Sequence, residues 1–160
     1  MSSNLLNRLK PFLILFIALT FSGCADDSIV DVYKEISSRN WSYIKKVSIP
    51  VQIDDADKTY NLYMNLRHTA DYRYSNIFVR IHQISPDGKR TTERKEFQLA
   101  YPDGEWLGSG AGNLYSYRLL FKEKYKFPSP GKYVFEFEQN MRDNPLREVR
   151  DVGIRVEVAE

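Results

Sequence analysis

Apolar and polar residues alternate with a period of two through most of the chain after residue 40. This period places every second side chain on the same face, as in a β-strand with one buried face. Tyr, Phe, Val and Ile dominate the alternating runs, and Gly, Pro, Asn and Asp separate them, which favours strands over helices. The alternation predicts about seven strands, at residues 43–53, 60–66, 77–82, 93–99, 115–121, 133–137 and 152–158.

The strand pattern also indicates the fold class, because it contains no long helical period and no internal repeat. Short strands separated by turns are typical of a sandwich, in which two sheets bury one face of each strand. We therefore expect an all-β, antiparallel β-sandwich with an immunoglobulin-like or jelly-roll-like topology, whereas a closed barrel fits the pattern less well. The domain is expected to occupy residues 41–160.

The strongest turn signal is Ser-Pro-Asp-Gly-Lys at residues 85–89. Proline presets φ and glycine takes the positive-φ position, so this segment predicts a hairpin between its flanking strands. Pro50 lies inside another alternating run and provides no N–H donor, which predicts an edge strand or a bulge there.

Polar and glycine-rich segments predict the remaining connections. A turn is expected at residues 54–57, and loops at 67–74, 101–112 and 141–146. Segment 101–112 contains four glycines between Gly104 and Gly112, which indicates unusual backbone angles.

The first 23 residues follow a different pattern, that of a secretory signal. Arg8 and Lys10 precede an unbroken apolar run at residues 12–19, and small residues then lead to Cys24. As a helix, an apolar run of about 10 residues spans roughly 15 Å, half the hydrocarbon core of a bilayer. The alternatives are a signal peptide cut elsewhere, and an uncleaved membrane helix, for which the run is too short.

Cys24 is the only cysteine of the chain and follows small residues, an arrangement similar to the lipobox of bacterial lipoproteins. In those proteins the thiol accepts a diacylglycerol and the preceding peptide is removed. An exported protein with one thiol forms no internal disulfide, and a thioether would cap that thiol. We predict a cleaved signal peptide at residues 1–23, lipidation of Cys24 and a lipidated, polar tether over residues 24–40.

Charge argues against a nucleic-acid partner. The chain has 23 Lys and Arg against 21 Asp and Glu, and the two extra cations, Arg8 and Lys10, lie in a leader without acids. Residues 24–160 therefore carry 21 charges of each sign. Recognition of nucleic acid requires a basic excess or stripe, and a balanced surface suits contact with proteins or a nearby membrane.

The chemistry-bearing residues do not form a catalytic or metal-binding pattern. His68 and His82 are the only histidines and have no third ligand at zinc spacing. The acidic turn at 54–57 lacks the glycine and trailing glutamate of a calcium loop. Asp103 and Glu105 could act as a glycosidase pair, but their position beside a Pro-Asp-Gly turn favours a role in shaping the loop. We expect no enzyme, no metal and no cofactor.

Aromatic residues around the glycine-rich loop leave two interpretations open. Trp106, Tyr101 and Tyr115 could stack on a sugar ring, which would make the domain a surface glycan-binding module. They could equally close one end of the hydrophobic core, which we favour.

Several longer motifs carry a resemblance to a known family. They are Asn65-Leu66-Arg67-His68, Asp71-Tyr72-Arg73-Tyr74-Ser75-Asn76-Ile77-Phe78, Pro102-Asp103-Gly104-Glu105-Trp106-Leu107-Gly108-Ser109-Gly110, Glu138-Gln139-Asn140-Met141-Arg142 and Asp151-Val152-Gly153-Ile154-Arg155-Val156. Together with the lipobox, they resemble the gliding-motility lipoprotein family GldH from Cys24 to nearly the end of the chain.

The resemblance implies an envelope lipoprotein required for bacterial gliding, an accessory component of the motility machinery and its linked secretion system. It implies no reaction and no cofactor. The implied partners are the bilayer, through Cys24, and other envelope proteins. The loops at 71–75 and 103–106 are candidates for partner contact, with Asp71, Tyr72, Tyr74, Asp103, Glu105 and Trp106 as the candidate residues.

The sequence after Cys24 bears on localisation. Ala25-Asp26-Asp27-Ser28 resembles the acidic signal that sends some lipoproteins of such bacteria to the cell surface. We therefore expect the outer membrane, with the periplasmic and the surface leaflet both open.

Overall fold

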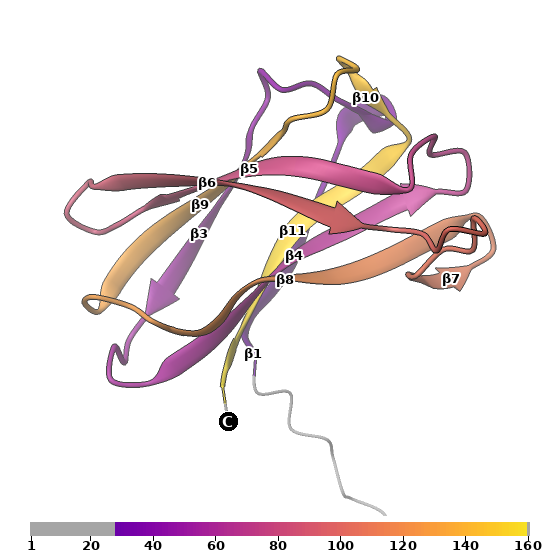
Figure 1. Cartoon of the computed structure of the whole chain (residues 1–160). Helices are drawn as coiled ribbons and strands as arrows, with labels where there is room; N and C mark the ends of the chain where they lie inside the picture. The colour runs from indigo at the N-terminus through magenta and orange to yellow at the C-terminus, as the bar shows by residue number, and fades with distance from the viewer. Residues whose placement is uncertain (1–27, 160) are drawn as a thin grey trace, which may run out of the picture.

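Two antiparallel sheets form the protein in a computed structural model that describes residues 28–159 (Figure 1). One sheet has five strands, in the order β1 (Ser28–Glu35), β11 (Val149–Val158), β4 (Thr59–Thr69), β8 (Leu114–Lys126) and β7 (Ser109–Ala111). The other has four, in the order β3 (Val47–Ile53), β9 (Gly131–Gln139), β5 (Asn76–Ile84) and β6 (Arg90–Gln98). A short pair, β2 (Asn40–Trp41) with β10 (Leu146–Arg147), and a 3-10 turn, η1 (Ser37–Arg39), complete the described part.

The predicted fold class is confirmed, since every paired strand is antiparallel and the sheets enclose one core. The described residues contain eleven strands, more than the predicted seven. Three of the additional strands, β2, β7 and β10, have only two or three residues, too few to show an alternation of their own.

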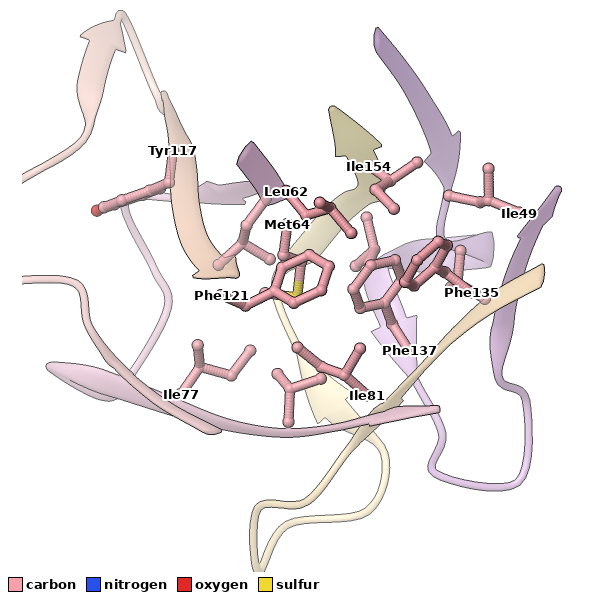
Figure 2. Close-up of a cluster of buried hydrophobic side chains, with 14 of the residues drawn as sticks. Ile49, Leu62, Met64, Ile77, Ile81, Tyr117, Phe121, Phe135, Phe137 and Ile154 are labelled. Atoms are coloured by element: carbon pink, nitrogen blue, oxygen red, sulfur yellow. The ribbon is translucent and has the colours of Figure 1, made fainter. Parts of the chain in front are cut away.

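The core lies between the two sheets and is built from the alternating apolar positions (Figure 2). Phe121 of the five-stranded sheet meets Phe135 and Phe137 of the other sheet edge to face, with ring centroids 6.1 and 6.0 Å apart. Each such buried side chain stabilises the fold by about 1.5–3 kcal/mol. The labelled side chains in Figure 2 that surround them are Ile49, Leu62, Met64, Ile77, Ile81, Tyr117 and Ile154.

Local sequence signals placed the hairpin and the edge strand correctly. Strands β5 and β6 pair along their full length, and the turn between them is closed by hydrogen bonds between Ser85 and Lys89 and from Gly88 N–H to Ser85 O. Gly88 has φ of 82°, the conformation that the turn requires. Pro50 lies in β3, an edge strand of its sheet.

Most strand boundaries differ from the prediction by a few residues, and two of these differences move a side chain into another environment. The run at 43–53 begins as a strand only at Val47, because the backbone turns at Ser42–Lys45 and leaves Tyr43 exposed. In the other case, the loop predicted at 67–74 is shorter, because β4 continues through Thr69 and carries His68 into the interior. Alternation alone assigns Tyr43 to the interior and His68 to a loop, whereas Tyr43 is exposed and His68 is buried.

The predicted tether over residues 24–40 is wrong for most of its length. Ser28–Glu35 is strand β1, which pairs with β11, and the following Ile36 donates its N–H to Arg150 O at 2.7 Å. Ile36 and Trp41 are buried in the core. The folded domain thus begins at or before Ser28, not at residue 41.

The two ends of the sandwich contain different segments of the chain. Strand β1 begins beside the C-terminal end of β11, and we call this end of the sandwich the anchor end (Figure 1). Strand β1 then runs to η1 and the β2–β10 pair at the opposite end, which we call the distal end. The distal end also carries the loops at 42–46, 70–75, 99–108 and 140–145. Hydrogen bonds join these loops, such as those from Tyr74 to Asp143, from Tyr43 to Asn144 and from Leu99 to Ser75.

Glycine at position 153 allows β1 to lie against β11. A Cβ atom at this position would lie 1.9 Å from the carbonyl oxygen of Val32 and 3.0 Å from Cα of Tyr33. These obstacles are backbone atoms of β1, which cannot rotate away as a flexible side chain could.

We therefore predict that Gly153→Ala displaces β1 and lowers the free energy of unfolding by about 1–3 kcal/mol or more, the cost of overpacking. Thermal or denaturant unfolding measures the loss, and limited proteolysis should cut first within β1. Thr91→Ala, on the exposed strand β6, is the control and should change neither. Unchanged stability of the Gly153 variant would contradict this packing.

Candidate functional site

A buried arginine of β11 fastens the neighbouring edge strand, β1, in the five-stranded sheet. The Arg155 side chain is only 8% exposed, and its Nη1 lies 2.8 Å from Asp31 Oδ2 on β1. Its Nε lies 2.8 Å from Glu157 Oε2, so one guanidinium holds two carboxylates. Because the Asp31 side chain is itself only 23% exposed, this ion pair is less screened by solvent than an ordinary surface pair.

Neutral side chains of β4 complete this network. Asn65 donates its Nδ2 hydrogens to Asp31 Oδ1 at 2.7 Å and to the Val32 carbonyl at 3.3 Å. Tyr63 donates its hydroxyl hydrogen to Glu157 Oε1 at 2.8 Å. Burial tends to raise the pKa of Glu157, but the hydrogen bonds from Arg155 and Tyr63 outweigh it and lower that pKa.

The position of β1 limits the distance between the domain and the predicted lipid. Cys24 lies outside the described residues, and four Cα–Cα steps separate it from Ser28, the first residue of β1. Four steps of extended chain span at most about 14 Å, whereas a free segment up to Trp41 would span about 60 Å. If Cys24 is acylated, the sandwich is held directly against the membrane surface.

A second cluster, of aromatic rings around His68, closes the distal end of the core. The His68 ring is fully buried, and its centroid lies 4.5 Å from that of Trp106, 4.8 Å from Tyr72 and 5.2 Å from Tyr117. Tyr115 lies at 5.9 Å. Strands β4 and β8 provide three of these rings, because His68 pairs with Tyr115 in the sheet register and Tyr117 follows two positions later.

Hydrogen bonds fix the orientation of the His68 ring. Its Nδ1 donates to the Thr69 carbonyl at 2.8 Å, and its Nε2 lies 3.0 Å from the Tyr117 hydroxyl. That hydroxyl also lies 2.9 Å from the Leu99 carbonyl, which already accepts from Leu107 N–H at 2.8 Å. The Tyr117 O–H donates to the Leu99 carbonyl, and its one hydrogen therefore has two acceptors within reach, that carbonyl and Nε2 of a neutral imidazole.

Burial lowers the pKa of His68 below its usual 6.5, and the hydrogen bond to Thr69 offsets this only in part. Burial raises the pKa of Tyr117 to about 12, so its hydroxyl stays protonated. The cluster is therefore neutral at ordinary pH and behaves as part of the core.

Trp106 reaches this cluster because the preceding turn folds the chain back. Tyr101 N–H donates to the Glu105 carbonyl, Gly104 N–H donates to the Tyr101 carbonyl, and the Asp103 carboxylate accepts from Glu105 N–H at 3.1 Å. Asp103 caps its own turn, and neither acid faces the other across a cleft. Trp106 is partly buried against the core, the packing expected of a residue that closes it rather than of an open sugar platform.

The proposed contact residues divide by their exposure. Tyr72 is in the core, and its ring centroid lies 5.8 Å from that of Tyr74 and 6.4 Å from that of Trp106, both partly buried. The acidic candidates Asp71, Asp103 and Glu105 are exposed. Tyr72 is 4% exposed and donates its hydroxyl to the Asn76 carbonyl, so it is unsuitable as a contact residue.

No local pattern in the sequence predicts the network around Arg155. Asp31 lay in the segment predicted as a tether, and Arg155 and Glu157 occupy outward positions that alternation assigns to solvent. The strand that covers them, β1, has no regular alternation, and without it their burial could not be foreseen.

The remaining candidate groups have structural partners. His82 lies between Thr92 Oγ1 and Glu138 Oε2, at 2.8 and 2.9 Å. Among residues 28–159, no three His, Cys, Asp or Glu side chains gather in a way that could hold a metal ion. No helix in the same range is long and apolar enough to cross a bilayer.

Comparison with known proteins identifies close relatives. Residues 28–156 match the family described as GldH lipoprotein. The chain is 35% identical over 153 residues to a gliding motility lipoprotein GldH homolog of Christiangramia forsetii, covering 91% of this chain and 93% of that protein. It is 30% identical over 152 residues to gliding motility lipoprotein GldH of Flavobacterium johnsoniae, covering 91% and 94%.

Solved structures show less similarity. The VP2 subviral particle of infectious bursal disease virus aligns with 83% of this chain and 32% of its own chain, at 13% identity and a TM-score of 0.36. A similarity this low carries no argument about function or fold.

The buried His68 generates a prediction about pH. Because its pKa is lowered in the folded state, the unfolded chain binds the proton more readily, and stability rises with pH. The His68 contribution should be complete above pH 6.5 and should be lost as the pH falls toward the lowered folded pKa. Denaturant unfolding at about pH 7.5 and about pH 5.5 brackets that window.

His68→Gln should flatten this pH dependence, whatever its effect on overall stability. His82→Gln is the matched control and should retain the slope, because His68 is intact. The same slope in the wild type and the His68 variant would show that His68 does not titrate differently on folding.

Proposed function

The chain belongs to the GldH lipoprotein family, and from this we propose that it is a lipid-anchored protein of the cell envelope that takes part in bacterial gliding motility. We propose further that it acts by contact, as an accessory component of the motility and linked secretion machinery, and that it resides in the outer membrane. Its partners are then the bilayer, through acylated Cys24, and neighbouring envelope proteins.

The observation that carries this proposal is the direct connection between the lipid site and a strand of the sheet. Three residues separate Cys24 from β1, and β1 is held by the Arg155 network. Acyl chains that enter a bilayer contribute about 0.8 kcal/mol per buried methylene, and two or more chains give a lasting anchor. The body of the protein is then fixed at a constant height on the membrane, which suits a component that positions other proteins.

The roles of the polar side chains support contact rather than catalysis. Both histidines, Asp103 and the Arg155 network are engaged in holding the fold. Asp71 and Glu105, which remain exposed, lie in the distal loops at 70–75 and 99–108.

The first test concerns the anchor. Cys24→Ala should give a protein that is not acylated, is absent from the membrane fraction in its processed form, and fails to restore gliding in a strain that lacks the gene. The readouts are mass spectrometry of the N-terminus, fractionation and gliding speed. Full gliding with the variant would contradict the need for the anchor.

The second test concerns the distance to the membrane. A flexible insertion of about 12 Gly and Ser residues between Asp27 and Ser28 adds an r.m.s. length of about 20 Å and leaves the lipid in place. We expect normal membrane fractionation but reduced gliding, because the domain is no longer held at one height.

The same insertion between Asp87 and Gly88, at the exposed β5–β6 turn, is the matched control and should leave gliding intact. Normal gliding with the longer tether would mean that the lipid only retains the protein at the membrane and does not position it.

A further inference from the structure

Most arginines of the described residues have a side-chain partner, and the three that have none lie at the distal end. Of the eleven arginines in residues 28–159, seven lie within 4 Å of a carboxylate, at positions 39, 67, 80, 90, 118, 150 and 155. An eighth, Arg94, donates to Asn140 and covers the ring of Phe78. The three that have no such partner within the described residues are Arg73, Arg142 and Arg147.

These three arginines line one cavity of about 440 Å³, together with Tyr74, Asp143 and the Asn144–Pro145 pair. They come from two loops far apart in the sequence, the β4–β5 loop and the segment from β9 through β10. The residues that line the cavity include three arginines and one aspartate, so its lining carries an excess of positive charge. Unpaired cations that converge on a concave site attract a complementary anion.

The side chain of Gln139 holds the loop that carries Arg142 in place. Gln139 is fully buried, accepts from Met141 N–H at 2.8 Å and donates to the Asp143 carbonyl at 3.0 Å. The Asp143 carboxylate accepts the hydroxyl hydrogen of Tyr74. The cavity is thus formed before any ligand arrives, which lowers the entropy cost of binding.

An exposed apolar tip adjoins the cavity. Tyr43 N–H donates to Asn144 Oδ1 at 3.2 Å, which joins the 42–46 loop to the cavity wall. Ile44, at the tip, is 76% exposed, more than any other isoleucine in the described residues. Tyr43, beside it, is 47% exposed. We call the cavity and this tip together the distal docking surface.

We propose that the distal docking surface binds an extended segment of another envelope protein that presents carboxylates to Arg142 and Arg147 and an apolar side chain to Ile44. This inference rests on the proposed function and names the partner chemistry. Guanidinium groups bind carboxylates through two parallel hydrogen bonds, and buried Arg and Tyr side chains dominate protein interfaces.

Two features favour a protein segment over lipid or glycan. Strand β1 places about 26 Å between the lipid end and this surface, at about 3.3 Å per residue over eight residues, so the headgroups of the protein's own membrane are out of reach. The apolar tip beside the cationic cavity suits a chain that alternates acidic and apolar side chains, and an anionic glycan offers nothing to Ile44.

Photocrosslinking in gliding cells tests the proposal with the full lipoprotein. A photoreactive phenylalanine analogue replaces Ile44, and the crosslinked peptide is identified by mass spectrometry. We expect a single protein adduct whose crosslinked peptide contains Asp or Glu within a few residues of the attachment point.

Charge reversal supplies the specificity test. Arg142→Glu with Arg147→Glu should lower the adduct yield by about tenfold or more, because attractive pairs become like-charge contacts. Lys89→Glu with Lys132→Glu, on exposed residues remote from the cavity, adds the same charge and should leave the yield unchanged. Replacing the identified acidic residues of the partner with lysine should restore the adduct with the Arg142→Glu, Arg147→Glu variant. Unfolding temperature and membrane fractionation of each variant show that fold and anchor are intact.

Three kinds of adduct would overturn the proposal: one whose yield ignores the arginine reversal, one whose crosslinked peptide contains no acids, and a heterogeneous ladder of polysaccharide adducts. The absence of any adduct in cells that glide normally with the analogue at position 44 would also overturn it. None of these outcomes bears on the lipid anchor, which the Cys24 variant and the tether insertion test separately.

Discussion

The ion pair between Arg155 and Asp31 connects the last strand of the fold to the first. The first strand follows the predicted lipid site, Cys24, after three residues. Gly153 makes the connection possible, because any Cβ there would meet the backbone of β1. A free segment from Cys24 to Trp41 could span about 60 Å, whereas the four steps from Cys24 to β1 span at most about 14 Å.

The two ends of the sandwich therefore differ in the segments that they contain. The anchor end brings the N-terminal strand and the C-terminal end of β11 together, next to the predicted acyl chains (Figure 1). The distal end gathers η1, the β2–β10 pair and the longest loops, and the His68 cluster closes the core beneath them. Because the core closes at this end with neutral aromatic rings, the charged groups of the loops remain free for contact. A contact function therefore requires no change in the fold.

The features of the fold that could be predicted from the sequence are those with local signals. The β5–β6 hairpin and the edge position of Pro50 follow from the chemistry of a few adjacent residues, and both were predicted. The alternation of Tyr133, Phe135 and Phe137 likewise placed β9 in the core. Strand β1 was missed because Asp31 and Lys34 are charged and make the segment resemble a linker; its stability comes from partners 124 residues away, such as Arg155. The candidate site shows the same difference between local and distant contacts. The capping role of Asp103 was predicted, because it depends on Glu105, two residues away. The burial of Tyr72 and the convergence of the three unpaired arginines were not predicted, because they depend on tertiary contacts.

Hydrogen exchange of the native, lipidated protein tests the central claim most directly, namely that β1 is an integral strand that joins the lipid to the sandwich. The β1 amides that pair with β11, around Val32 and Lys34, should exchange as slowly as those of β11 itself, and Asp31→Ala should make β1 exchange faster while the four-stranded sheet is unaffected. Exchange of β1 at the rate of an unstructured peptide in the wild-type protein would contradict the account.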